Sequence, residues 1–331
     1  MAKKYKKFLY NPELDFVNDE YPGNPVLNDK FIYGQNGENI SFAKVLKWLI
    51  SPKPNKKIKK EEEYRVPVVS DRSFLRNKND GILWLGHASF LIRISGTLFL
   101  TDPCLRSLPF LKRKTELPFP ISDLINIDYV LVSHGHRDHF DIPTVKQIHA
   151  QNPGAKFLVP LRLAKMLENA GISNYQEAGW YQRYKTSGPE VIFLPAKHWH
   201  RRGVKDMNKI LWGSFLLRTN GKSVYFGGDT GYGKHFKEIR ELLDNNFDEV
   251  ILPIGAYEPA YIMKSNHLNP AEAVEAFHDL RGRRLIPMHY GTYDLADEPL
   301  GDPETRIRKL HLKGKIKGDL KICRIGENVE I

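Results

Sequence analysis

Three histidines and one aspartate occur within residues 134–139, and this cluster constrains the chain more than any other feature. The apolar, partly β-branched run 129–132 before it predicts a buried strand that ends at Ser133. A loop at a strand end can turn all four side chains toward one point. Imidazole nitrogens and carboxylate oxygens are ligands that Zn²⁺ or a similar divalent ion prefers. The His-x-His-x-Asp-His spacing therefore predicts a metal site rather than a solvated His-rich loop.

This spacing resembles the signature of the metallo-β-lactamase fold superfamily, whose members build one- or two-metal hydrolytic sites. The resemblance implies further ligands at the ends of later strands. Apolar segments at 191–194, 223–226 and 285–288 are each followed by such a residue, and these residues are His198, Asp229 and His289.

The same resemblance implies how the ligands divide between two Zn²⁺ ions, although another divalent metal would suit the same residues. One metal is held by His134, His136 and His198, the second by Asp138, His139 and His289, and Asp229 bridges the two. All seven positions are filled, which favours an active enzyme.

The chain divides into an N-terminal extension, residues 1–80, expected to pack on the core, and a hydrolase domain, residues 81–331. The extension is rich in Asn, Pro, Lys and Gly. Its segment 41–50 predicts an amphipathic helix, for which core packing is favoured over a membrane surface with Trp48 at the interface. The charges of Lys56–Glu63 largely cancel, which indicates a solvated linker.

From Gly81 onward, strands and helices alternate in both halves of the domain. Asp141 and Asn269 are predicted helix N-caps, and each is followed by an early proline. We expect an α/β fold, the four-layer αββα metallo-β-lactamase sandwich with its metals at one edge. His87 and Asp102 fall at strand ends beside that edge, where they would either orient ligands or serve the turns.

The 331 residues carry 50 Lys and Arg against 39 Asp and Glu, a net charge of +11. A basic surface attracts nucleic acid, anionic lipid or phosphorylated substrates, and charge does not choose among them. Two cysteines imply no disulfide framework. The basic N-terminus lacks an apolar region after it, and no stretch is long enough to span a bilayer. We therefore expect a cytoplasmic protein whose membrane contact, if any, is peripheral to the inner face.

The segments around the ligands are more specific than the motif. These segments are 197–203, 211–215, 228–232, 252–259, 263–273 and 288–292. As a set they resemble the N-acyl-phosphatidylethanolamine-hydrolysing phospholipase D family, and the resemblance covers roughly residues 80 to 310. The resemblance implies a phosphodiesterase in which a metal-bound hydroxide attacks phosphorus. The products would be N-acylethanolamine and phosphatidic acid, and the family implies a homodimer.

Four residues are candidates for roles in the reaction. His267 lies on a loop before the helix capped by Asn269, and would bond a phosphate oxygen or protonate the leaving group, in preference to a structural role. Tyr257 and Glu258 are candidate head-group contacts. Asp138 is a metal ligand that could also relay a proton.

Two other functions remain open at this point. Gly86-His87-Ala88-Ser89 is shared with ascorbate-6-phosphate-lactonase-like relatives, so the substrate could instead be a soluble ester, lactone or phosphodiester. A nuclease is less favoured, and no nucleic acid partner is expected. The intervals 139–198, 198–229 and 229–289 are too short to hold an inserted domain, and no aromatic-interleaved basic platform is visible.

Overall fold

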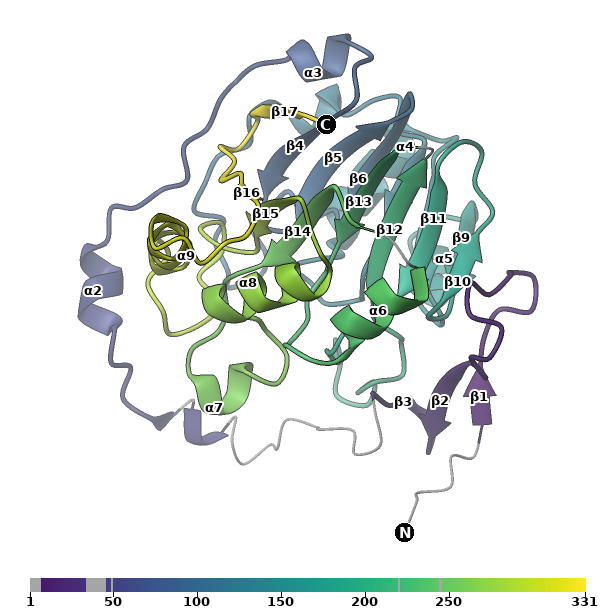
Figure 1. The fold of residues 1–331 in the computed structure, drawn as a ribbon, viewed down its shortest axis with the longest axis horizontal. Helices are drawn as coiled ribbons and strands as arrows, with labels where there is room; N and C mark the ends of the chain where they lie inside the picture. The colour runs from purple at the N-terminus through teal and green to yellow at the C-terminus, as the bar shows by residue number, and fades with distance from the viewer. Residues whose placement is uncertain (1–6, 34–45, 49, 220, 244–245) are drawn as a thin grey trace.

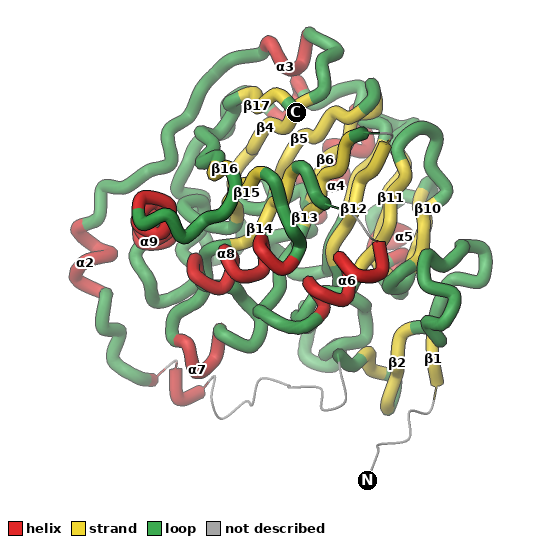
Figure 2. The backbone as a smooth tube through the Cα atoms, in the orientation of Figure 1, coloured by secondary structure: helices red, strands yellow, loops and turns green. Residues whose placement is uncertain are grey.

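The computed structural model describes residues 7–33, 46–48, 50–219, 221–243 and 246–331. Two seven-stranded sheets pack face to face, and helices cover the outer face of each (Figure 1). Figure 2 shows the same arrangement as red helices on both sides of the yellow strands. The predicted four-layer αββα metallo-β-lactamase fold is confirmed.

The strands of the first sheet run in the order β17-β4-β5-β6-β7-β8-β9, and those of the second in the order β10 to β16. Their bounds are β4 (Gly81–Gly86), β5 (Ser89–Ile94), β6 (Thr97–Thr101), β7 (Tyr129–Leu131), β8 (Lys156–Pro160), β9 (Tyr175–Ala178), β10 (Gln182–Tyr184), β11 (Glu190–Leu194), β12 (Ser214–Thr219), β13 (Lys222–Phe226), β14 (Glu249–Pro253), β15 (Arg284–Met288), β16 (Asp319–Leu320) and β17 (Asn328–Glu330).

Among the described residues, the helices include four long ones and several short ones. Their bounds are α2 (Lys56–Glu61), α3 (Ser73–Arg76), η1 (Ile121–Asp123), α4 (Ile142–Gln151), α5 (Ala164–Asn169), α6 (His235–Leu243), α7 (Ala260–Met263), α8 (Pro270–Asp279) and α9 (Asp302–Leu312). In the described part of the chain, no helix has the length and apolar character needed to cross a membrane.

The strands read as unbroken apolar runs because both of their faces are buried. In β4, Ile82 and Trp84 belong to the core between the sheets, whereas Leu83 and Leu85 belong to the core beneath α4 and α5. Successive side chains of a strand point to opposite faces, so each strand contributes to two layers. This double burial fixes the strand ends, from which the site loops emerge.

The predicted helix starts are confirmed. The Asp141 carboxylate accepts a hydrogen bond from the Thr144 backbone at the start of α4, and Asn269 forms a full capping box with Glu272 at the start of α8. The prediction for residues 56–63 was wrong. Lys56–Glu61 is helix α2, and Lys59 forms an ion pair with Asp294.

The N-terminal residues 7–33 form a small separate sheet of β1 (Lys7–Leu9), β2 (Asn24–Leu27) and β3 (Lys30–Phe31). Leu14, Val26 and Phe31 are buried in the same apolar cluster as the inner faces of the two large sheets. The division at residue 80 remains a prediction. Most of the expected 41–50 helix, residues 41–45 and 49, lies outside the described residues.

Candidate metal centre

All seven expected ligands lie at one edge of the sandwich, where the carboxyl ends of the strands meet. The loop after β7 supplies His134, His136, Asp138 and His139, and the loops after β11, β13 and β15 supply His198, Asp229 and His289. Strands β13, β14 and β15 are parallel, so the residues that follow them emerge on the same side. The double-sided core therefore brings together residues 155 positions apart in the chain, from His134 to His289 (289 − 134).

One group consists of His134, His136 and His198. The His136 Nδ1 atom lies 2.8 Å from His134 Nε2 and 3.3 Å from His198 Nε2. Ligand nitrogens around a tetrahedral zinc ion with bonds of 2.0–2.1 Å are about 3.3 Å apart. The three nitrogens thus converge at a spacing that suits one ion.

A second group consists of Asp138, His139 and His289, with Asp229 between the groups. The Asp138 Oδ2 atom lies 3.6 Å from His139 Nε2 and 3.8 Å from His289 Nε2. One Asp229 oxygen, Oδ2, is 3.3 Å from His139 Nε2 and 3.8 Å from His198 Nε2, and the other, Oδ1, is 3.1 Å from His289 Nε2. Asp229 therefore faces both groups at once.

The buried atoms at the centre fit a metal better than they fit one another. His139 Nε2, His289 Nε2 and Asp229 Oδ1 are buried and make no hydrogen bond among the described residues. Leaving such atoms unpaired in a folded interior is costly. Oxygen and imidazole donors in this number are a suitable set for zinc.

The electrostatics of the centre also suit a cation. Burial alone would lower the pKa of His289, but Asp229 and Asp138 outweigh it and raise that pKa to about 9. Burial would raise the pKa of the Asp229 carboxyl, but His139 and His289 hold it well below its usual range. The two carboxylates thus favour positive charge here, and a divalent ion would displace the imidazole protons.

The outer nitrogens of the ligand histidines are held by the surrounding chain. His139 Nδ1 donates to Asp102 Oδ2 at 2.7 Å, and Asp102 also accepts hydrogen bonds from the Ser133 backbone and hydroxyl. His198 Nδ1 donates to the Asn266 carbonyl at 3.0 Å. Each bond turns the opposite ring nitrogen toward the centre.

His87 and Asp102 both contact candidate ligands and both also occupy turn positions, so the structure is compatible with each of the alternatives left open by the sequence. His87 Nε2 lies 3.1 Å from Asp138 Oδ2, in the same potential metal-holding group as His139 and His289. Burial lowers the pKa of His87 to about 3. His87 also occupies a left-handed turn position, with a φ of 55°.

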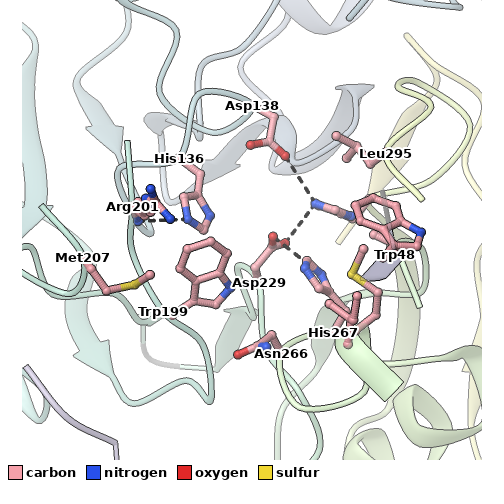
Figure 3. A pocket seen from close by; sticks show the side chains of 14 residues that line it. Trp48, His136, Asp138, Trp199, Arg201, Met207, Asp229, Asn266, His267 and Leu295 are labelled. Atoms are coloured by element: carbon pink, nitrogen blue, oxygen red, sulfur yellow. Dashed lines mark hydrogen bonds and ion pairs between the residues drawn. The ribbon is translucent and has the colours of Figure 1, made fainter. Parts of the chain in front are cut away.

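A cavity of about 420 Å³ opens over these residues (Figure 3). His267 lines it, and its Nδ1 atom lies 3.8 Å from Asp229 Oδ2 and has no hydrogen-bond partner within the described part of the chain. Burial lowers the pKa of His267 to about 4. Besides His267, the lining residues are Trp48, His136, Asp138, Trp199, Arg201, Met207, Asp229, Ala256, Ile262, Met263, Asn266, His289 and Leu295.

Tyr257 and Glu258 do not line this cavity. The Tyr257 hydroxyl donates to Asp302, and a Glu258 oxygen accepts a hydrogen bond from the Ala260 backbone. Their contact with a head group remains a prediction.

Sequence reasoning missed most of the cavity wall. Trp199 and Arg201 could have been found, because they follow the ligand His198 directly. Trp48 carried only the signal of an amphipathic segment, which says nothing of its neighbours in space.

Comparison with known proteins defines the class of this chain. The model of the beta-lactamase superfamily domain matches residues 97–290, more than half of the sequence. A metallo hydrolase from the archaeon Ignicoccus hospitalis superposes with a TM-score of 0.59 at 21% identity, over 76% of this chain and 98% of that one. The chain belongs to the metallo-β-lactamase fold superfamily of metal-dependent hydrolases.

Within that superfamily the chain belongs to the N-acyl-phosphatidylethanolamine-hydrolysing phospholipase D-like family. It is 38% identical to "N-acyl-phosphatidylethanolamine-hydrolyzing phospholipase D 1" of Caenorhabditis elegans, over 69% of this chain and 68% of the relative. It is 32% identical to the mitochondrial enzyme of that name in Saccharomyces cerevisiae, over 71% of this chain and only 52% of the relative. A metal-dependent hydrolase of Methanopyrus kandleri is 30% identical over 75% of this chain and 99% of its own length.

Proposed function

We propose that this chain is a two-zinc phosphodiesterase of phospholipase D type. Its substrate is N-acyl-phosphatidylethanolamine or a related phospholipid, and its products are N-acylethanolamine and phosphatidic acid. The observation that carries the proposal is the position of Asp229 between two three-residue ligand groups, beneath a cavity with apolar walls. The names of the C. elegans and yeast relatives, both N-acyl-phosphatidylethanolamine-hydrolysing phospholipases D, support this choice of substrate.

The chain would hold one ion through His134, His136 and His198, and the other through Asp138, His139 and His289, with Asp229 shared. Two such ions lower the pKa of water and stabilise charge on phosphoryl oxygens. The chain's own residues keep this centre in place, because Asp102 fixes the ring of His139 and the Asn266 carbonyl fixes the ring of His198.

His267 is the residue that we assign to the leaving group. Its Nδ1 atom faces the centre and makes no hydrogen bond to any residue that the structure describes. A neutral imidazole with an N–H at this position can donate a hydrogen bond to the departing oxygen. Such a donor, placed where charge develops, contributes to the rate and little to metal binding.

Exposed apolar residues that lie close in sequence to the cavity lining suit contact with a lipid surface. Val204 is 85% exposed and Tyr261 48% exposed, each within three residues of a residue that lines the cavity. Lys205 and Lys264 stand beside them and would favour anionic head groups. We expect the protein to sediment with phosphatidylserine-containing vesicles, and the uncharged substitution Val204→Ser to weaken this binding. Unchanged sedimentation of Val204→Ser would mean that the binding is only electrostatic.

The deciding experiment measures metal content and lipid turnover on the same preparation. N-acyl-phosphatidylethanolamine in mixed micelles is the substrate, and N-acylethanolamine is measured by mass spectrometry. We expect two metal ions per chain, and a His267→Ala variant that keeps both ions while kcat falls about 10²–10⁴-fold. His311→Ala, which changes an exposed histidine on α9, is the control and should match the wild type.

Two results would contradict the proposal. Two bound metals with no lipid turnover, but rapid hydrolysis of a soluble ester or phosphodiester, would place the substrate elsewhere. Full activity in His267→Ala would remove that residue from the reaction.

A further inference from the structure

Trp48 lies far in sequence from every ligand, yet its side chain lines the cavity above them. Its indole Nε1 donates to Asp297 Oδ2 at 2.7 Å. Lys53 donates to the Trp48 carbonyl at 2.8 Å, forms an ion pair with Asp297 Oδ1 at 3.4 Å and lies 4.1 Å from the centre of the indole ring. Hydrogen bonds, charge and ring contact thus hold this indole in one orientation.

The chain that follows Trp48 is fastened to the loop that carries Asp297. Asn55 donates to the Asp297 carbonyl at 3.1 Å, and Glu62 accepts hydrogen bonds from the backbones of Leu300 and Gly301, both at 2.8 Å. We call Trp48 and residues 50–64 the strap. Because it is attached at both ends of this loop, the strap can hold Trp48 in the wall.

The two sides of the cavity differ in kind (Figure 3). Trp48 and Leu295 lie on the same side as His267, and the backbone of His267 is bonded to Met263, another apolar lining residue. Trp199, Arg201 and Met207 lie on the opposite side, near His136. The side next to His267 is therefore uncharged apart from the site residues, while the other side carries a guanidinium.

We propose that Trp48 is a specificity-determining residue that ends the subsite for the N-acyl chain of the leaving group. This rests on the proposed function, in which His267 bonds the leaving oxygen. Whatever that oxygen carries must then extend along the wall beside His267, and that wall is formed by Met263, Leu295 and Trp48. The glycerol chains of the phosphatidyl part extend away from it.

The held indole makes this subsite sensitive to chain length. A buried methylene is worth roughly fourfold in an equilibrium constant or in kcat/KM. An acyl chain that ends at Trp48 gains this factor in kcat/KM for each carbon up to the indole ring. A longer chain gains nothing further from its additional carbons. Removing the indole should let the added carbons be buried as well.

The test uses two lipid series on the full-length, metal-loaded enzyme. One series varies only the N-acyl chain and the other varies only the glycerol chains. We expect Trp48→Ala to raise the kcat/KM ratio of 20-carbon to 16-carbon N-acyl substrates by about tenfold or more, on the scale of a few buried methylenes, without changing the glycerol series. Asp297→Ala should shift the ratio in the same direction by less, and Ile58→Ala, on the exposed face of the strap, should leave it unchanged.

An unchanged N-acyl ratio in Trp48→Ala, or an equal shift in the glycerol series, overturns the assignment of the wall. Trp48→Phe, which keeps an aromatic ring but has no N–H, guards against misfolding and should give an intermediate shift. Calorimetric binding of N-acylethanolamines of both lengths separates this proposal from the function it rests on. If binding prefers one chain length and this preference depends on Trp48, the assignment of Trp48 to the N-acyl subsite is supported even if no lipid is hydrolysed. If binding shows no such preference, the assignment is overturned even if lipid is hydrolysed.

Discussion

The floor of the cavity and its walls are built in different ways. The floor consists of the seven residues His134, His136, Asp138, His139, His198, Asp229 and His289. It is formed by loops that leave the ends of hydrogen-bonded strands. The apolar walls are formed by Trp48, Trp199, Met207, Ile262, Met263 and Leu295, which come from loops, the short helix α7 and the N-terminal segment.

This difference separates the kind of reaction from the choice of substrate. Shifting a floor residue would mean moving a strand that is buried on both faces, so the ligand geometry is fixed by the core. A wall residue can change with its loop while the strands stay in place. The fold therefore sets the positions of the ligand residues in this metal-dependent hydrolase, and the walls would determine which ester reaches the metals.

Removing the shared carboxylate is expected to have the largest effect, and it tests the floor directly. Asp229→Ala takes away the group that faces both ligand clusters, leaving His139 and His289 to repel each other. We expect most of the metal to be lost, and kcat/KM to fall by about 10³-fold or more, as for the loss of a reacting group. Metal analysis and a lipid hydrolysis assay on one preparation measure the metal content and kcat/KM. A variant that hydrolyses lipid normally without metal would refute the assignment of the floor residues to a catalytic metal centre.

A smaller effect is expected from Asp102→Asn, which changes the residue that holds the ring of the ligand His139. The new amide must present its NH₂ either to the Ser133 backbone N–H, in place of Oδ1, or to the Ser133 hydroxyl and His139 Nδ1, in place of Oδ2. All of these groups donate to Asp102 now. If it faces His139, the ring proton moves to the nitrogen that points at the centre and blocks it.

We expect metal binding in Asp102→Asn to weaken about 10–100-fold, as other losses of a ligand's support do. Titration of the metal-free protein with zinc measures this. Asp128→Asn is the control, because that carboxylate accepts a hydrogen bond from Leu98 at the other end of the same sheet. Equal weakening in both variants would mean that the change acts through stability.

The sequence predicts the floor better than the walls, for a physical reason. A ligand such as His198 is readable because it follows an apolar strand at a fixed offset, and strand ends converge in a predictable way. The contact between Trp48 and Asp297 joins residues 249 positions apart through loops, for which no periodic pattern exists.

The same limit explains the wrong prediction for residues 56–63. Balanced charges indicate a solvated linker as long as their partners are unknown. Here Lys59 pairs with Asp294, and the Glu62 carboxylate caps two backbone amides, so the charges are used in docking. Asp102 was ambiguous for a related reason, because a buried bond to His139 and a turn signal before Pro103 look alike in sequence.

The smallest expected effect comes from loosening a wall while the floor stays intact. Glu62→Ala leaves the amides of Leu300 and Gly301 without their partner, at a cost of about 1 kcal/mol for a half-buried pair of hydrogen bonds. Hydrogen exchange at these two amides should become faster, and the N-acyl length ratio should move the same way as in Trp48→Ala, but only a few-fold. Metal content should not change.

The control is Glu63→Ala, which changes the exposed neighbouring residue and should leave all three measurements at wild-type values. Loss of metal in Glu62→Ala would show that wall and floor are one unit, because a strap that is distant from every ligand in sequence would then be holding the centre together.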